Sequence, residues 1–168
     1  MERLLPYQSA HHQAEVGPQL GERREEIVEA RWEWIDFQNN TINVYPTDTF
    51  TPKTCGPVEL HSTLKRILLA HFHTGRAPFI IKPTNRAQAE TLRYNPRRTF
   101  TTASRNAGIE GATVKTLRYT FASQLVINGA SLYYVQKQMR HSDPTTTMIY
   151  AHLAPGSKEI ERIPTLES

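Results

Sequence analysis

Apolar residues at helical spacing, closed by strong stop signals, fill the C-terminal half of this 168-residue chain and limit its fold more than any other feature. Leu117, Phe121 and Leu125 recur every four residues, which predicts a single buried stripe along one helix. The pair Asn128-Gly129 then supplies a stop, because glycine accepts the left-handed backbone that ends many helices. The pattern therefore predicts a helix over Leu117–Ile127.

Two further helices are predicted to follow without long linkers. Ser131 can cap a helix over Leu132–Met139, whose apolar residues would face the core. Asp143-Pro144 is a cap followed by proline at the first helical position, which predicts a short helix over Thr145–Tyr150. This last helix would carry a tyrosine near the end of the chain.

The remaining segments complete a mainly α fold, a helical domain with a small antiparallel β-sheet at one edge. Residues Thr41–Tyr45 and Pro57–His61 alternate apolar and polar side chains and are separated by turn residues, which predicts a hairpin. Pro78–Lys82 could add a third strand. The other predicted helices are Leu20–Arg31, Thr63–Phe72, Ala87–Arg93 and Arg97–Ala107.

Length and composition predict one domain over residues 19–156, between a loosely ordered N-terminal segment, 1–18, and a C-terminal tail, 157–168. The sequence has no stretch of about 18 uninterrupted apolar residues that could cross a membrane. The first 17 residues lack the apolar run of a secretory signal, and Cys55 is the only cysteine. We therefore expect a protein of the reducing cytoplasm with no membrane partner.

Positive charge is concentrated in one part of the sequence. Residues 76–157 carry 11 Lys/Arg against 3 Asp/Glu, whereas residues 1–75 carry 7 against 10. A basic block of this kind favours a phosphate-rich partner such as double-stranded DNA, because contacts to phosphates release counterions. A solvated basic surface explains the charge about as well, so the choice between the two rests on motifs.

Four short motifs occur in order along the chain. They are Gly21–Ile27, which contains Arg23, then Lys115–Ala122, Arg140–Ser142 and Thr146–Leu153. Tyr150 lies nine residues after His141. Together these motifs resemble the catalytic domain of tyrosine recombinases, the phage integrase family, over about Leu20 to Leu153.

The resemblance implies an enzyme that cuts and rejoins DNA through a 3′-phosphotyrosine intermediate, with Tyr150 as the nucleophile. Arg23 and Arg118 match the family's two catalytic arginines, His141 matches the histidine of its G-H-S motif, and Lys53 matches a hairpin lysine that acts as general acid. The resemblance also implies a homotetramer on two DNA sites and an N-terminal helical domain before this one. No cofactor, metal or small-molecule substrate is expected.

Elementary chemistry supports these roles. A phosphodiester attacked by a hydroxyl gathers charge on its non-bridging oxygens, which two forked, permanently charged arginines can bind. Arg118 is expected in the first turn of its helix, where free N–H groups strengthen an anion site. Tyr150 has an ordinary pKa of about 10 and is a weak nucleophile, so it needs these charges and His141 nearby.

Each of these residues also has a simpler interpretation. Arg23 could form surface ion pairs with neighbouring glutamates, His141 could be a capping or core histidine, and Tyr150 could be a core aromatic. His71 and His73 could suggest a metal, but two residues apart they do not share a helix face, and no further plausible ligands accompany them. The order and spacing of the motifs favour the catalytic interpretation.

Three positions depart from the family pattern. Lys115 stands where the family has histidine; it can donate to a phosphate oxygen, but it is a poor proton acceptor near neutral pH. Arg140 replaces the glycine before His141, and its side chain disfavours a left-handed backbone there. The hairpin after Lys53 is short and lacks the arginine that the family carries before its Val-Pro-Leu run.

Two alternatives remain open. One is a non-catalytic DNA-binding relative that keeps the fold, and the departures at Lys115 and Arg140 favour it. The other is a type IB topoisomerase, whose catalytic domain is similar but which needs no sequence-specific partner site. The small size of the chain and its Ala151–Leu153 ending favour the recombinase.

Overall fold

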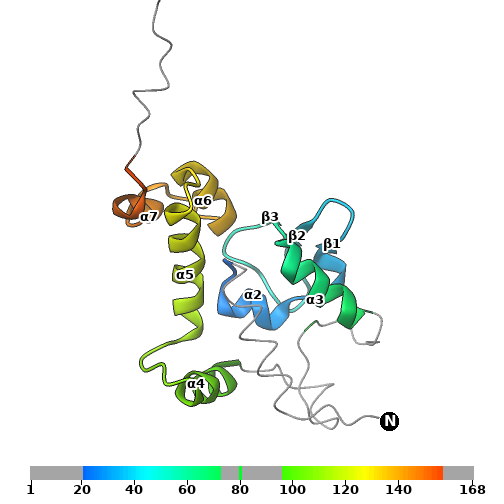
Figure 1. The fold of residues 1–168 in the computed structure, drawn as a ribbon. Coiled ribbons are helices and arrows are strands. Elements are labelled where there is room, and N and C mark those ends of the chain that lie inside the picture. Colours follow the sequence, from blue (N-terminus) through cyan, green and yellow to red (C-terminus); the bar gives the residue numbers. More distant parts are fainter. Residues whose placement is uncertain (1–20, 73–79, 81–95, 157–168) are drawn as a thin grey trace, which may run out of the picture.

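The computed structural model describes residues 21–72, 80 and 96–156. Its helices are α2 (Arg24–Glu29), α3 (Ser62–Phe72), α4 (Pro96–Asn106), α5 (Val114–Ile127), α6 (Leu132–Met139) and α7 (Thr145–Met148), with single 3-10 turns η2 (Trp32–Trp34) and η3 (Ala151–Leu153). Figure 1 shows two groups of elements, with α5, α6 and α7 on one side and α2, α3 and the sheet on the other. α4 lies at the N-terminal end of α5.

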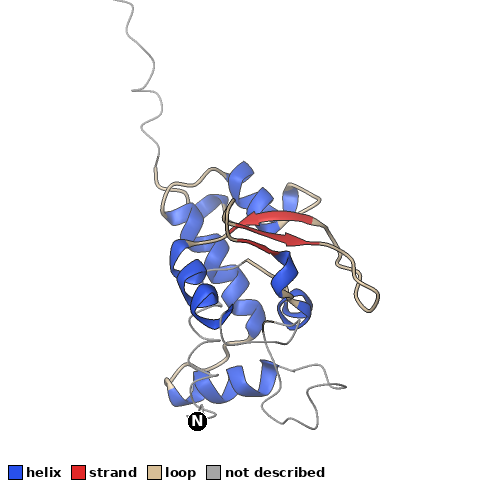
Figure 2. Ribbon diagram, turned by 90° about the vertical axis from the view of Figure 1, so that its right-hand side faces the viewer, coloured by secondary structure: helices blue, strands red, loops and turns tan. Residues whose placement is uncertain are grey.

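The sheet forms from short segments that each bury one face. β2 (Thr41–Val44) pairs antiparallel with β3 (Gly56–Glu59), and β1 (Ile35–Asp36) pairs with the other edge of β2. The predicted hairpin is thus confirmed, and Figure 2 shows the sheet beside the helices. β1 is not evident from the sequence, because two residues carry no recognisable alternation.

A first hydrophobic core lies between the sheet and α3. Its buried side chains are Trp34, Ile42, Val44, Val58, Leu60, Leu64 and Leu68. Ile80 packs against this core, and its N–H donates to the carbonyl of Ala30 at 2.9 Å. The rest of the predicted strand Pro78–Lys82 lies outside the described residues.

A second core joins α5 and α6 to the segment around Tyr150. Its buried side chains are Ala122, Val126, Val135, Met139 and Tyr150. The inward stripe of α5 therefore runs one position away from the predicted stripe and comprises Val114, Arg118, Ala122 and Val126. Leu117, Phe121 and Leu125 are only half-buried, so the prediction of a single buried stripe through them is wrong. The small side chain of Ala122 leaves room for close packing against α6.

α5 begins three residues earlier than predicted because Thr113 caps it. The Thr113 hydroxyl accepts a hydrogen bond from the N–H of Thr116 at 3.3 Å, and the Thr116 hydroxyl accepts one from the N–H of Thr113 at 3.0 Å. Arg118 consequently lies in the second turn, and the expectation that it lies among the free N–H groups of the first turn is wrong. α6 has its predicted bounds, with Ser131 as its cap.

Two predicted helices that carry motif residues are shorter in the structure. α7 ends at Met148, so Tyr150 lies in the turn before η3 and not on the helix as predicted. The predicted helix Leu20–Arg31 is reduced to α2, because the backbone of Arg23 is extended and Ala30 leaves the helical region.

The other predicted elements are either matched or fall outside the described residues. α3 and α4 agree with the predicted bounds within one residue at each end. The predicted helix Ala87–Arg93, the segment 1–18 and the tail 157–168 lie outside the described residues. Within the described ranges, no helix combines the length and the hydropathy that a membrane span needs.

Candidate active site

Arg23 is the cap residue of α2 and reaches two other parts of the chain. Its guanidinium donates to the Glu26 carboxylate at 2.9 Å, to the Thr54 hydroxyl at 3.0 Å and to the carbonyl of Arg140 at 3.3 Å. The simpler interpretation, a surface ion pair, accounts for only the first of these contacts. Arg23 therefore joins α2 to the β2–β3 loop and to the end of α6.

Arg118 is buried, with only 8% of its surface exposed. Its two terminal nitrogens donate to the carbonyls of Gly21 and Met139. Gly21 permits this approach, because a Cβ at that position would lie 2.8 Å from the Met139 sulfur. Burial, and then the charge of Arg23, lower the pKa of Arg118 to about 10, so its side chain stays charged near neutral pH.

The two arginines therefore converge on consecutive carbonyls at the end of α6, those of Met139 and Arg140. The last carbonyls of a helix lack partners within the helix and carry partial negative charge, which favours cations. Two like charges held together also repel each other, and a bound anion would relieve that repulsion. The arrangement is suited to a phosphate group.

His141 follows Arg140 directly after α6. Its Nδ1 lies 2.9 Å from the Thr147 hydroxyl, and the Gln136 side chain donates to its carbonyl at 3.1 Å. Burial, followed by the charges of Arg118 and Arg23, lowers the pKa of His141 to about 4. The imidazole is therefore neutral at pH 7 and lies within the field of both arginines.

Tyr150 lies in the turn after α7 and is 5% exposed. Its ring packs in the second core, so the interpretation as a core aromatic describes the ring correctly. Burial and the nearby phenol of Tyr119 raise the pKa of Tyr150, whereas the charge of Arg118 opposes that rise. The charge of Arg118 therefore favours the ionised form of the phenol.

The side chains of the two candidate lysines are exposed. Lys53 lies in the β2–β3 loop beside Thr54, whose hydroxyl donates to the carbonyl of Arg140 at 2.9 Å and so ties this loop to the end of α6. Lys115 lies in the first turn of α5, with its Nζ 5.2 Å from the centre of the Tyr119 ring.

Three buried ionisable residues, Glu22, Glu26 and Arg140, complete the region. The sequence predicts no role in the site for Glu22 or Glu26. The Arg140 guanidinium lies between these carboxylates and donates to both. Glu22 precedes α2, so its spacing of four residues from Glu26 does not place the two carboxylates on one side of a helix, and no local pattern in the sequence indicated their pairing with Arg140. Arg140 has φ 48° and ψ 48°, so the left-handed backbone that its side chain was expected to disfavour is nevertheless adopted.

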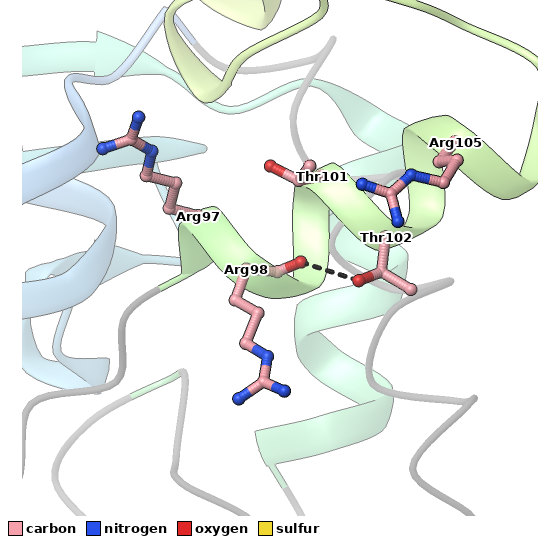
Figure 3. A pocket seen from close by; sticks show the side chains of 5 residues that line it. All are labelled: Arg97, Arg98, Thr101, Thr102 and Arg105. Carbon is pink, nitrogen blue, oxygen red and sulfur yellow. Dashed lines mark hydrogen bonds between the residues drawn. The ribbon is translucent and has the colours of Figure 1, made fainter.

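A second basic surface lies on α4. Arg97, Arg98 and Arg105 are exposed, and together with Thr101 and Thr102 they line an open hollow of about 490 Å³. Figure 3 shows that the arginine side chains extend in different directions from the helix, while the Thr102 hydroxyl donates to the carbonyl of Arg98 at 3.0 Å. Side chains that fan out in this way can meet several phosphates of one nucleic acid backbone.

The chain is similar to known integrases over most of its length. The sequence profile of the phage integrase family matches residues 15–156. The integrase of Salmonella phage P22 is 28% identical over 146 residues, which are 81% of this chain and 37% of that protein. The chain thus spans little more than a third of that relative.

Solved structures have the same fold. The catalytic domain of bacteriophage HP1 integrase has a TM-score of 0.66 and 21% identity, over 92% of this chain and 82% of the other. The Tn1549 transposon integrase, solved with a circular intermediate DNA, has a TM-score of 0.74 and 16% identity, over 94% of this chain and 59% of the other. These structures show the fold, and the profile match over most of the chain shows that it belongs to the phage integrase family.

Proposed function

We propose that this chain is the catalytic part of a site-specific DNA recombinase that cuts and rejoins DNA through a 3′-phosphotyrosine intermediate. The observation that carries the proposal is the convergence of Arg23 and Arg118 on the last carbonyls of α6, directly before His141. The charge of Arg118 also favours ionisation of the Tyr150 phenol. Two fixed cations, a neutral imidazole and a phenol suit the transfer of a phosphoryl group to tyrosine.

In the proposed reaction, the hydroxyl oxygen of Tyr150 attacks the scissile phosphorus. The tyrosine oxygen bonds to phosphorus and gives up its proton, for which His141 is the proposed acceptor. The bond to the 5′-oxygen breaks, and the 5′-oxygen takes up a proton, for which Lys53 is the proposed donor. Arg23 and Arg118 would hold the non-bridging oxygens, and Lys115 would be a further donor to them. Attack by a 5′-hydroxyl reverses these steps, so the strand is rejoined without nucleotide hydrolysis.

The low pKa of His141 fits a role at the tyrosine. A neutral imidazole can accept a hydrogen bond from the phenol, which a charged imidazolium cannot. The charges of Arg118 and Arg23 contribute to that low pKa, and a bound phosphate would offset them. Phosphate binding should therefore raise the basicity of His141 at the moment when the tyrosine must lose its proton.

The burial of Tyr150 favours a second candidate, a DNA-binding relative that does not cut DNA. A phenol that is 5% exposed must turn outward before it can reach a phosphate. The presence of Lys115 where the family has histidine also favours the non-catalytic candidate. Both candidates predict DNA binding, so covalent attachment is the property that separates them.

The decisive experiment is a search for covalent attachment. The full chain is incubated with a pool of nicked duplexes with randomised sequence around the nick, so that cleavage releases a short fragment and traps the adduct. We expect an adduct that survives denaturation, disappears in Tyr150→Phe, and persists in Tyr133→Phe, a matched change at an exposed tyrosine of α6. Mass spectrometry should locate the nucleotide on Tyr150.

The opposite result is equally informative. If the wild-type chain forms no adduct with any duplex in the pool while wild type and Tyr150→Phe bind DNA equally well, the non-catalytic candidate stands and the recombinase proposal fails.

Double-stranded DNA is the proposed partner, supported by the exposed arginines of α4 and by the DNA-bound structure of the Tn1549 integrase. Assembly of four chains on two DNA sites belongs to the same proposal and rests on family membership. Action in the reducing cytoplasm is also proposed, and the single free thiol of Cys55 is consistent with it.

A further inference from the structure

Arg140 combines two unusual features at the junction between α6 and His141. Its backbone is left-handed, with φ 48°, a conformation that glycine adopts without penalty and arginine rarely adopts. Its guanidinium is nevertheless buried, with 4% of the side chain exposed. A charged side chain in such a place needs compensation from several partners.

The compensation comes from Glu26 on α2 and from Glu22, which lies two residues before the helix begins. Nη1 donates to Glu22 at 3.0 Å, and Nη2 donates to Glu22 and also to Glu26, whose side chain is 1% exposed. Nε is buried without a hydrogen-bond partner, so the two terminal nitrogens make all the hydrogen bonds of the guanidinium to the carboxylates. The side chain therefore fixes the end of α6 against the segment that carries Arg23.

The backbone of the same residue makes the complementary contact. Its carbonyl accepts hydrogen bonds from the Arg23 guanidinium at 3.3 Å and from the Thr54 hydroxyl at 2.9 Å. The left-handed conformation determines where this carbonyl and the following His141 point. The side chain of Arg140 thus contacts the α2 segment, and its backbone contacts Arg23 and the β2–β3 loop and leads directly into His141.

We infer that Arg140 is a positioning residue. Its buried pairing with Glu22 and Glu26 fixes the position of the His141 imidazole relative to the guanidinium groups of Arg23 and Arg118. The inference deepens the proposed function, because the arrangement matters for DNA cleavage at that site. Glu26 serves both sides of the junction, since it also accepts from the backbone N–H and the guanidinium of Arg23.

The test replaces Arg140 by a residue that is compatible with the left-handed backbone. Arg140→Gly accepts the left-handed conformation and removes the whole side chain, including the guanidinium. Because this change leaves Glu22 without its cation, whereas Glu26 keeps its pairing with Arg23, the double variant Arg140→Gly with Glu22→Gln restores the charge balance and guards against unfolding. Arg140→Lys keeps the charge without the fork and should retain part of the function. Lys137→Gln, an exposed change on α6, is the matched control.

Two measurements are made on each folded variant. NMR titration of the histidine ring protons, assigned with His141→Asn, should show the His141 pKa rising in the glycine variants by about one unit or more as the imidazole leaves the field of the arginines. Adduct formation at saturating DNA should fall about tenfold or more, while DNA affinity changes by less than about threefold. Lys137→Gln should leave the His141 pKa at its wild-type value.

The proposal fails if the folded glycine variants keep the wild-type pKa of His141, or if that pKa rises while adduct formation at saturating DNA is unchanged. Failure of the proposed function looks different, because the wild-type chain itself would form no adduct. The titration alone would then decide whether Arg140 positions His141.

Discussion

Arg23 and Arg118 donate hydrogen bonds to consecutive backbone carbonyls at the end of α6, those of Arg140 and Met139. Arg23 comes from the start of α2 and Arg118 from the second turn of α5, so the end of α6 is where the two groups of elements in Figure 1 meet. The chemistry proposed for this chain depends on that junction, because neither arginine is held in place by its own helix alone.

Replacing Arg118 by lysine should slow DNA cleavage while keeping the charge. The ammonium cannot reproduce the forked geometry of the guanidinium, and loss of one transition-state donor costs about 3 kcal/mol, or about 100-fold in rate. The unfolding free energy should also fall by about 1–3 kcal/mol, since one of the carbonyls of Gly21 and Met139 loses its partner. Single-turnover adduct formation and chemical denaturation measure the two effects. Arg66→Lys, at an exposed position of α3, should change neither. An unchanged cleavage rate in Arg118→Lys would remove Arg118 from the site.

Lys53→Ala should slow cleavage of ordinary DNA but not of DNA whose 5′ bridging oxygen is replaced by sulfur. A thiol has a pKa of about 8.5, against roughly 16 for water and similar values for alcohols, so a thiolate leaves without receiving a proton. The ratio of cleavage rates on the two substrates measures the proton donation. Equal slowing on both substrates would assign Lys53 to DNA binding and not to acid catalysis.

Removing arginines from α4 should weaken DNA binding and flatten its salt dependence. Arg98→Gln and Arg105→Gln each delete one exposed positive charge of the hollow shown in Figure 3. If each arginine contacts a phosphate, the slope of log affinity against log salt should fall by about one per substitution, with little effect of DNA sequence. Titrations at several salt concentrations check this, with Arg66→Gln as the control on α3. A slope that is unchanged in both α4 variants would place the DNA elsewhere.

Glu22→Gln should gain stability relative to the wild type as pH rises. Burial raises the pKa of Glu22 to about 7 from an ordinary 4.5, although the Arg140 charge opposes the rise. Between pH 4.5 and 7 the folded protein therefore binds more protons than the unfolded chain at this residue, and its contribution to stability falls as pH increases. Glutamine stays neutral and does not suffer that loss, which can reach about 3 kcal/mol.

Unfolding of both proteins at pH 5 and pH 8 tests this expectation. His141 titrates over an overlapping range with the opposite sign, because its pKa is lowered to about 4 in the folded protein. Its contribution is common to both proteins and cancels in their difference. A difference in stability that is equal at the two pH values would contradict a raised pKa of Glu22.

Local patterns in the sequence were sufficient for much of the fold. The cap Ser131, the stop Asn128-Gly129 and the alternation in β2 and β3 act over a few residues, so the bounds of α6, the end of α5 and the hairpin could be predicted directly. Predictions failed where the controlling contact was distant or had no strong pattern. The cap Thr113 extends α5 at its start. Because α6 packs against Ala122, the buried stripe of α5 lies one residue away from the predicted stripe.

The sequence by itself determined the family and the candidate residues Arg23, Arg118, His141 and Tyr150, because motif identity and spacing are properties of the chain. Only the tertiary structure decided how these groups meet. Arg118 points inward from the second turn of α5, Tyr150 is packed into a core, and Arg140 adopts a left-handed backbone that its own side chain opposes. The last of these rests on a buried ion pair with Glu22 and Glu26, and the balance between backbone strain and ion pairing exists only when the distant partners are brought together by folding.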